Sequence, residues 1–397
     1  MVTQVYVAAH DSASDCPPRG SAHGEHAVRS APTRDRHGEL RATRDLAGRA
    51  HRALEGGRAV VDQSHLGVVR VTGPDRLSWL NSLGTQEVGA LEPGVGVEYM
   101  ILSPQGRVEH VASIVDDGEA AWLITETAAG LATFLDRMRF MLRVEVADVS
   151  ADWAAIGEAV SSPAAPGEPV TWADPWPGIS AGGTSYAAAD ATAGADRAWR
   201  LVLVPRDTLE AAVRERVDSG WTLAGTWATE AIRIAAHRPR AATEVDATTL
   251  PHELDWLRTA VHLHKGCYRG QETVAKVHNV GRPPRRLTLL HLDGSGHTVP
   301  EPGAEVRLGD KVVGRVTSVA RHHELGPVAL AAIKRAADPA ATLTVAADGD
   351  PIAATQEPIV NAEGFSIDRP PPPGPTAKGL LMGKGCAADG GDIPDPS

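Results

Sequence analysis

The order of strand-like and helix-like segments between residues 66 and 146 constrains the fold of this chain most strongly. Residues 66–71 predict a strand, and Gly73-Pro74 opens a helix, because proline is favoured at the first helical position. Further strands are expected at 98–102, 107–115 and 121–124, then a helix over 128–140 and a strand at 143–146. We interpret this order as a split β-α-β arrangement, an α+β architecture with helices on one face of a sheet.

The later part of the chain predicts a second α+β unit and then a different pattern. Strands are expected at 154–157 and 199–204, with helices over 209–217 and 226–237, and the segment 160–195 is interpreted as loops. From residue 287 to residue 345 short strands alternate with glycine turns, which is typical of a small antiparallel β-barrel.

These patterns give a division of the chain into five parts. Residues 1–46, rich in Ser, Arg, His, Asp and Pro, are expected to form a disordered arm, and residues 361–397 a disordered Pro/Gly-rich tail. Between them we expect a first α+β domain at 47–150, a second at 151–282 and a barrel at 283–360.

Composition narrows the classes of function. The 397 residues carry a formal net charge of −11, which argues against a general nucleic-acid binder. Only three cysteines occur, which fits a reducing cytoplasm rather than a disulfide framework. No apolar run approaches the ~18 residues of a membrane span. We expect a cytoplasmic monomer that contacts neither membrane nor nucleic acid directly.

The segment with the most concentrated chemistry is Lys265-Gly266-Cys267-Tyr268-Arg269-Gly270-Gln271-Glu272, called the signature segment below. Thiolate is the reactive form of cysteine, and nearby cations stabilise it. Lys265 and Arg269 each stand two residues from Cys267, so both side chains share its face in an extended loop. The alternative is a small buried cysteine, because cysteine is among the most buried residue types.

Two other interpretations of this region stay open. His262, His264 and Cys267 have a spacing that zinc sites use, but a structural site needs four ligands and only one cysteine is at hand. Gln271 and Glu272 could bind the edges of a heterocycle, since an amide donates and accepts and a carboxylate accepts from N–H groups. The alternative for Glu272 is a local ion pair with Lys276. We expect no permanently bound metal.

The signature segment resembles that of the YgfZ-type folate-binding proteins, a family of iron–sulfur cluster assembly proteins related to the aminomethyltransferase (T protein) of the glycine cleavage system. Three further stretches, at residues 73–86, 103–108 and 230–234, resemble the family's first helix, its early hairpin and the helix before the signature. The resemblance covers roughly residues 50–355.

This resemblance implies a ring of two α+β, ferredoxin-like domains and a C-terminal barrel around a channel that binds tetrahydrofolate. It implies a role in assembling or maintaining iron–sulfur client proteins, including tRNA-thiolating enzymes, with Cys267 as the functional residue tuned by Lys265. Tyr268 and Gln271 would shape the loop or contact the ligand. Arg233 and Arg240 would anchor the glutamate tail, because arginine binds carboxylates bidentately, or would form ordinary ion pairs at the helix end.

One departure from the aminomethyltransferases bears on activity. Those enzymes carry an acidic pair a few residues after the early glycine, whereas here His110 stands at the position of the aspartate, directly after Glu109. This substitution argues against aminomethyl transfer, and whether the protein is an enzyme stays open. The alternatives are a folate-dependent one-carbon transferase or demethylase, with Glu109 as the local acid, and a non-catalytic scaffold.

Overall fold

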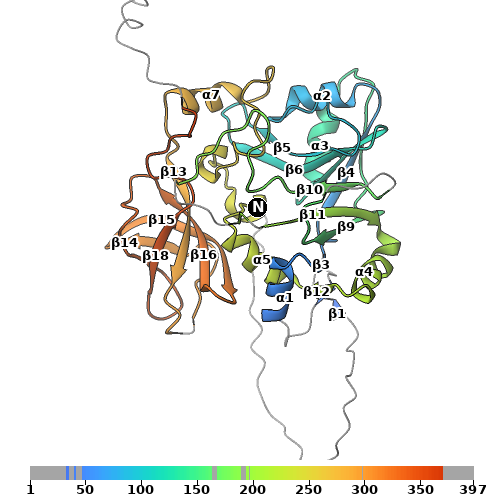
Figure 1. The fold of residues 1–397 in the computed structure, drawn as a ribbon. Coiled ribbons are helices and arrows are strands. Elements are labelled where there is room, and N and C mark those ends of the chain that lie inside the picture. The colour runs from blue at the N-terminus through green and yellow to red at the C-terminus, as the bar shows by residue number, and fades with distance from the viewer. Residues whose placement is uncertain are drawn as a thin grey trace, which may run out of the picture. The chain divides into compact units, whose positions relative to one another are not determined.

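The computed structural model describes residues 33–34, 40–41, 47–162, 168–188, 194–195, 197–296 and 298–369 (Figure 1). Most of the expected arm and the tail beyond residue 369 therefore lie outside the described residues. Within the arm, β1 (Thr33–Arg34) and β2 (Leu40–Arg41) pair as antiparallel strands. In the described part of the chain, no helix is long and apolar enough to cross a membrane.

The first sheet has five antiparallel strands in the order β5-β6-β7-β4-β8. Two helices, α2 and α3, pack on one face through an apolar core that includes Leu80, Tyr99 and Leu131. All five strands and both helices were expected from the sequence, although their order was interpreted as a split β-α-β unit. The elements are β4 (Gly67–Thr72), α2 (Arg76–Leu83), β5 (Gly96–Leu102), β6 (Val108–Asp116), β7 (Ala120–Thr125), α3 (Ala128–Met138) and β8 (Glu145–Asp148).

The second sheet has the order β10-β11-β9-β3-β12 and packs face to face on the first. Val68 and Trp122 of the first sheet meet Ala155 and Leu203 of the second in one apolar layer. Helix α4 packs on the opposite face, and α1 and α5 cover the β3–β12 edge. The elements are α1 (Ala47–Glu55), β3 (Ala59–Asp62), β9 (Trp153–Glu158), β10 (Thr171–Ala173), β11 (Arg200–Pro205), α4 (Leu209–Asp218), β12 (Thr222–Ala224) and α5 (Thr226–Ala235).

Strand β3 crosses the expected boundary between the two α+β units. It precedes the first sheet in the chain, yet it pairs antiparallel with β9 and parallel with β12 in the second sheet. Residues 47–62, expected in the first domain, therefore contribute α1 and β3 to the second sheet.

The third part is a closed barrel in the order β13-β16-β15-β14-β17-β18, drawn in orange and red in Figure 1. Its interior is filled by leucine, isoleucine, valine and alanine side chains. The fold class is thus α+β with two sheets and a barrel, as predicted. The strands are β13 (Arg285–Leu292), β14 (Glu305–Leu308), β15 (Lys311–His322), β16 (Gly326–Lys334), β17 (Leu343–Val345) and β18 (Ile352–Pro358).

Short helical segments fill the junction of the three parts. They are α6 (Ala241–Glu244), η3 (Pro251–Leu254) and α7 (Gln271–Asn279), whereas η2 (Arg206–Thr208) directly precedes α4 in the second part. One apolar core joins Met100 of β5, Ile234 of α5, Val274 of α7 and Leu289 of β13. Residues 361–369 also pack here, although they were expected to belong to the tail. The Asn361 side chain, for example, donates to the carbonyl oxygens of two other residues.

Candidate functional site

The signature segment folds as a loop that leads into helix α7. Gly270 caps this helix with a φ of +84°, a backbone conformation that glycine adopts without strain. A Cβ atom on Gly270 would lie 2.5 Å from the carbonyl oxygen of Ser103, and one on Gly106 would lie 2.7 Å from Cβ of Thr273. The turn after β5 and the start of α7 therefore pack backbone to backbone, which joins two of the stretches that the family resemblance singled out.

Cys267 lies on the exposed side of this loop and is a free thiol. The alternative interpretation, a small buried cysteine, is wrong. The next residue, Tyr268, points the other way and is 7% exposed, within the core that joins the three parts. Burial raises the pKa of the Tyr268 phenol, so this side chain serves as a neutral anchor. The loop thus holds its thiol outward by burying its phenol.

The ammonium group of Lys265 binds residues at the end of helix α2 and just after it. Its Nζ lies 2.6 Å from the carbonyl oxygen of Asn81, 3.0 Å from Oδ1 of the same residue, and 2.8 and 2.7 Å from the carbonyl oxygens of Gly84 and Gln86. An ammonium has three hydrogens, so these four acceptors account for its donors. Burial lowers the pKa of Lys265 to about 8, and Glu87 opposes that shift. The predicted tuning of Cys267 by this cation stays a prediction, and the contacts give Lys265 a structural task.

Arg269 is likewise paired, with Glu109 of β6. Its Nη1 lies 2.5 Å from Oε2 of Glu109, and its guanidinium stands 5.4 Å from the ring centre of Phe134. His110 contacts the same ring and lies 3.4 Å from Oγ1 of Thr127. Burial lowers the pKa of His110, Glu109 opposes this, and Arg269 adds to it. Glu109 and His110 therefore border the signature segment on an exposed side of the first sheet.

Gln271 and Glu272 form the first turn of α7. The backbone N–H of Gln271 donates to the carbonyl oxygen of Tyr268 at 3.3 Å, and Glu272 is exposed. An acid in the first turn is favourable to a helix, because the N-terminus carries partial positive charge. The proposed contact of these two residues with a heterocycle stays a prediction.

The three residues of the zinc interpretation, His262, His264 and Cys267, do not converge on one point in the structure. The rings of His262 and His264 are 6.3 Å apart between centroids and perpendicular to each other. Across the described residues, the histidine, cysteine and carboxylate side chains that converge closely enough to hold an ion form one group, and it lies elsewhere.

A cavity of about 150 Å³ opens between the two sheets and α5. It is called the sheet cavity below. Its wall combines indole rings with charged side chains from β5, β10 and α5 and from the segments that flank these elements. The charged and indole-bearing residues are Glu98, Glu126, Trp172, Asp174, Arg197, Trp199, Arg233, Arg238, Arg240 and Trp256.

Arg238 occupies the centre of the charge network in this wall. It lies 2.8 Å from Oε1 of Glu98 and 3.2 Å from Oδ2 of Asp174. Glu98 also accepts from the indole of Trp256 at 3.0 Å, and Asp174 from Arg197 at 2.5 Å. Burial lowers the pKa of Arg238, but the two carboxylates outweigh it and the pKa rises. Glu98 and Asp174 thus place two carboxylates in the wall of the sheet cavity.

Arg233 and Arg240 are both paired with Glu230. Arg233 also lies 3.1 Å from Glu244, and Arg240 also pairs with Glu126. Burial would raise the pKa of Glu230, but the two arginines outweigh it and hold the pKa at about 2. Arg233 is buried, whereas the side chain of Arg240 is 31% exposed, which places Arg240 at the mouth of the cavity. Of the two predicted anchors, only Arg240 is therefore placed to meet a ligand from solvent.

Sequence reasoning missed Glu98, Asp174 and Arg238. Glu98 is the one charged residue of β5, and this single charge was the available signal. Asp174 and Arg238 lie in segments without periodicity, and the pairs that Arg238 makes with Asp174 and Glu98 span 64 and 140 residues. No local pattern predicts pairs of that separation.

Comparison with known families agrees with this architecture. Residues 25–165 match the GCVT N-terminal domain, and residues 285–358 match the glycine cleavage T-protein C-terminal barrel domain. The chain carries both domains of the T-protein type. Its aminomethyltransferase-like fold also resembles the crystal structure of glycine cleavage system aminomethyltransferase T from Bartonella henselae, with a TM-score of 0.62 and 16% identity over 81% of this chain and 91% of that one.

Relatives of this aminomethyltransferase-like chain carry different names. The aminomethyltransferase of Streptomyces coelicolor is 26% identical over 71% of this chain and 79% of its own length. The chloroplastic protein At1g60990 of Arabidopsis thaliana, whose name proposes a transferase, is 25% identical over 67% of this chain and 62% of its own length. An iron–sulfur cluster assembly factor IBA57 homolog, mitochondrial, of Mycosarcoma maydis is 26% identical over 59% of this chain and 58% of its own length.

Proposed function

We propose that this protein binds a tetrahydrofolate in the sheet cavity and helps to assemble, repair or maintain iron–sulfur proteins through Cys267. The observation that carries the proposal is the exposed thiol on a loop whose backbone is packed against the first sheet. The folate and the iron–sulfur client proteins are its proposed partners. A relative named for iron–sulfur cluster assembly supports the client class, and relatives named aminomethyltransferase support the folate.

The size of the sheet cavity suits the head group of a folate better than the whole molecule. Its volume of about 150 Å³ is below the ~300–1,000 Å³ of pockets that enclose drug-sized ligands. Three indole rings, of Trp172, Trp199 and Trp256, line it and offer flat surfaces to a pterin. The glutamate tail would then extend past Arg240 towards solvent.

The charged groups of the cavity wall also suit a folate, provided that one of their ion pairs opens. A pterin presents N–H edges that a carboxylate accepts, and a glutamate tail presents carboxylates that arginine binds. The carboxylates and guanidinium groups of this cavity are already paired with one another. Binding therefore has to open a pair, and the two pairs of Arg240, with Glu126 and with Glu230, are the most exposed of them. A bound reduced folate would supply ring nitrogens that carry one-carbon units, while these residues orient it.

Fluorescence and calorimetry test the folate part. Tetrahydrofolate should quench tryptophan emission saturably, because three indoles line the cavity. We expect Arg240→Met to weaken binding by roughly tenfold, the value of one charged hydrogen bond. Arg269→Met, which removes an arginine outside the cavity wall, is the matched control. Absence of saturable binding by both methods would contradict the proposal that this protein binds folate.

Genetic complementation tests the thiol part. In cells that lack this protein, Cys267→Ser should fail to restore the activity of iron–sulfur enzymes. Cys16→Ser and Cys386→Ser are the matched controls, because they remove the other two thiols of the chain. Full restoration by Cys267→Ser would refute a role for the thiol, whatever the outcome of the folate titration.

A folate-dependent one-carbon transferase is the second candidate. Relatives named aminomethyltransferase favour it, and the sheet cavity provides acids of its own in Glu98 and Asp174. Glu109, the acid first considered, is instead paired with Arg269. Tetrahydrofolate-dependent one-carbon transfer that survives Cys267→Ser and is lost in Glu98→Gln would favour this candidate over the first.

A further inference from the structure

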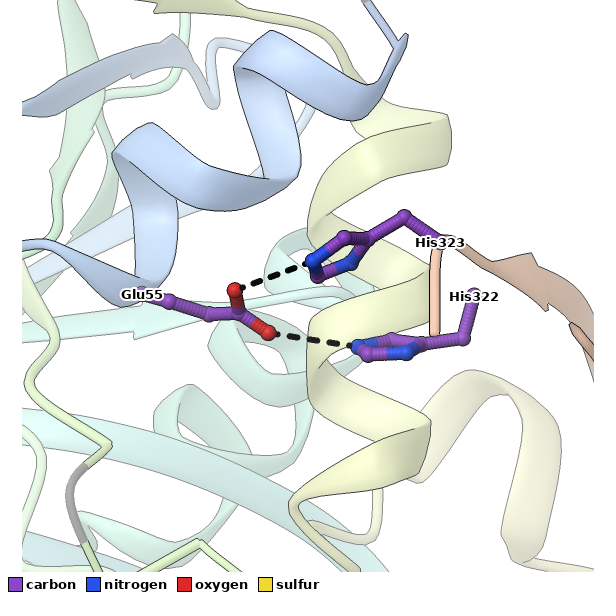
Figure 2. Close-up of side chains that lie close together, drawn as sticks. All are labelled: Glu55, His322 and His323. Carbon is purple, nitrogen blue, oxygen red and sulfur yellow. Dashed lines mark ion pairs between the residues drawn. The ribbon is translucent and has the colours of Figure 1, made fainter. Parts of the chain in front are cut away.

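A carboxylate and two imidazoles converge between the end of helix α1 and the end of strand β15 (Figure 2). Oε1 of Glu55 lies 3.4 Å from Nε2 of His322, and Oε2 lies 3.4 Å from Nε2 of His323. The ligand atoms of the three residues are within 4.8 Å of one another. Figure 2 shows both rings turned towards the carboxylate from the barrel side.

The surroundings make this cluster more than a surface ion pair. The side chains of His322 and His323 are 5% and 14% exposed, while Glu55 is 40% exposed and leaves one side open to solvent. A neutral imidazole gains little from a carboxylate 3.4 Å away, since that distance is long for a hydrogen bond. The three ligand atoms are therefore close to one another but far enough apart to leave space between them.

A third imidazole supplies an independent observation. His51 stands one helical turn before Glu55 on α1 and is 4% exposed. Its ring stacks on His322 at 5.6 Å between centroids and meets His323 edge-on at 5.2 Å. Among the described residues, neither its Nδ1 nor the Nδ1 of His323 has a hydrogen-bond partner. Buried polar atoms rarely go unpaired, and here two of them belong to imidazole rings that contact each other.

We propose that Glu55, His322 and His323 bind one divalent transition-metal cation of the zinc type. Two imidazoles and one carboxylate are ligands that zinc takes in proteins, with a fourth position left for water. Mixed nitrogen and oxygen ligands also disfavour calcium and magnesium, which prefer oxygen alone. The solvent-facing side of Glu55 is where that water would bind. His51 packs on both ligand rings and holds their orientation, so it is a positioning residue.

Metal binding requires a change in the turn that follows β15. Nδ1 of His322 lies 3.3 and 3.2 Å from the backbone N–H groups of Glu324 and Leu325, so the hydrogen of the neutral ring is on Nε2. A cation on Nε2 requires that hydrogen on Nδ1, and the two long contacts then open. The amides of Glu324 and Leu325 therefore report binding.

The cation would tie α1 to the barrel. Glu55 belongs to the helix that packs beside α5, whereas His322 ends strand β15 and His323 follows it. A metal bound only by the folded chain stabilises that chain by mass action. The site is outside the signature segment and the sheet cavity, so the proposal stands apart from the proposed function.

Zinc titration of the full chain, prepared without an affinity tag and stripped with a chelator, tests the site. We expect one zinc per chain by calorimetry and a rise of several degrees in the midpoint of thermal unfolding. Glu55→Gln and His323→Ala should each weaken zinc binding by about 100-fold or more, and His51→Ala by about tenfold, because removing an outer partner costs less than removing a ligand. Cobalt bound in place of zinc should give visible absorption bands that His323→Ala abolishes.

His23→Ala/His26→Ala is the matched control, because it removes two other histidines of the chain that also flank a glutamate. It should leave stoichiometry and affinity unchanged. Hydrogen exchange at Glu324 and Leu325 should change with zinc in the wild-type chain and not in Glu55→Gln. The proposal is overturned if the stripped chain binds no zinc, or if binding survives Glu55→Gln and His323→Ala while the control abolishes it. Circular dichroism of each variant separates lost ligands from lost fold.

Discussion

The signature segment and the sheet cavity hold charge in different ways. The signature places Lys265, Cys267 and Arg269 together in eight consecutive residues, yet the two cations bind partners from elsewhere and the thiol stays exposed. The sheet cavity brings Glu98, Asp174 and Arg238 from distant segments into one buried network. In the signature segment, charged side chains that are close in sequence therefore bind different partners. In the sheet cavity, charged side chains that are distant in sequence bind one another.

The comparison predicts that ion pairs in the two regions differ in their contribution to stability. Glu98→Ala should lower the free energy of unfolding by about 3–5 kcal/mol, because it leaves the buried Arg238 without its closest partner. Glu109→Ala should cost less than about 1 kcal/mol, because its pair with Arg269 is about one-third exposed. Denaturant unfolding measures both. Equal losses would break the distinction between the two regions.

Low pH should also affect the two regions differently. His252 contacts α7, the helix that the signature segment begins, and Glu230 pairs with two arginines of the sheet cavity. Burial lowers the pKa of His252, which lies beneath α7, to about 3. Between pH 3 and pH 6.5 the unfolded chain then binds more protons than the folded one at this residue, so stability falls as the pH falls. From pH 6 to pH 4 the loss is about 2.5 kcal/mol. Glu230 at the cavity, with its pKa at about 2, keeps its charge throughout this window.

Unfolding curves at pH 6 and pH 4 check this prediction. The variant His252→Gln should show a smaller loss than the wild-type chain over the same interval. Glu230→Gln should also reduce that loss, but only by about 0.8 kcal/mol, because the Glu230 carboxyl begins to bind protons near pH 4.5 in the unfolded chain and stays charged in the folded one. An unaltered pH dependence in His252→Gln would contradict the assignment.

Two glycines of the signature segment provide a sharper test within one region. Gly270→Ala should cost about 2 kcal/mol, because alanine is strained at a φ of +84° and its Cβ would meet the carbonyl oxygen of Ser103. Gly266→Ala should change stability little, since its Cβ would have no neighbour within 4 Å. Thermal unfolding of both variants measures the difference. A larger effect at Gly266 would show that the loop is held otherwise.

The smallest expected effect concerns the thiol itself. Arg269→Met should change the rate of alkylation of Cys267 by less than about threefold at neutral pH, because Glu109 already neutralises that guanidinium. Iodoacetamide labelling in a Cys16→Ser/Cys386→Ser background isolates this rate. A fall of tenfold or more would restore the sequence-based hypothesis that the neighbouring cations activate the thiol.

Local periodicity explains which parts of the fold the sequence could predict. The strands and helices of the first sheet follow apolar repeats and were expected within a few residues of their bounds. Helix α7 was missed, because its apolar residues are few, and β18 was missed, because half of its residues are polar. At the site, the exposed Cys267 was found through a contiguous motif. Gly84, a partner of Lys265, lies 181 residues away, and the partners of Arg238 lie 64 and 140 residues away, so no local window of sequence contains them.

Strand β3 has a consequence for the order in which the chain can fold during synthesis. Its parallel partner β12 begins at Thr222, which is 160 residues after Asp62, the last residue of β3. At a synthesis rate of ~5–20 residues per second, roughly 10–30 s pass between the synthesis of β3 and that of β12. The first sheet, made entirely of residues 67–148, can form in the interval. Until its other partner β9 follows at Trp153, the nascent chain therefore holds a finished first sheet beside an apolar strand without a partner. This is the stage at which it is most open to chaperones and to aggregation.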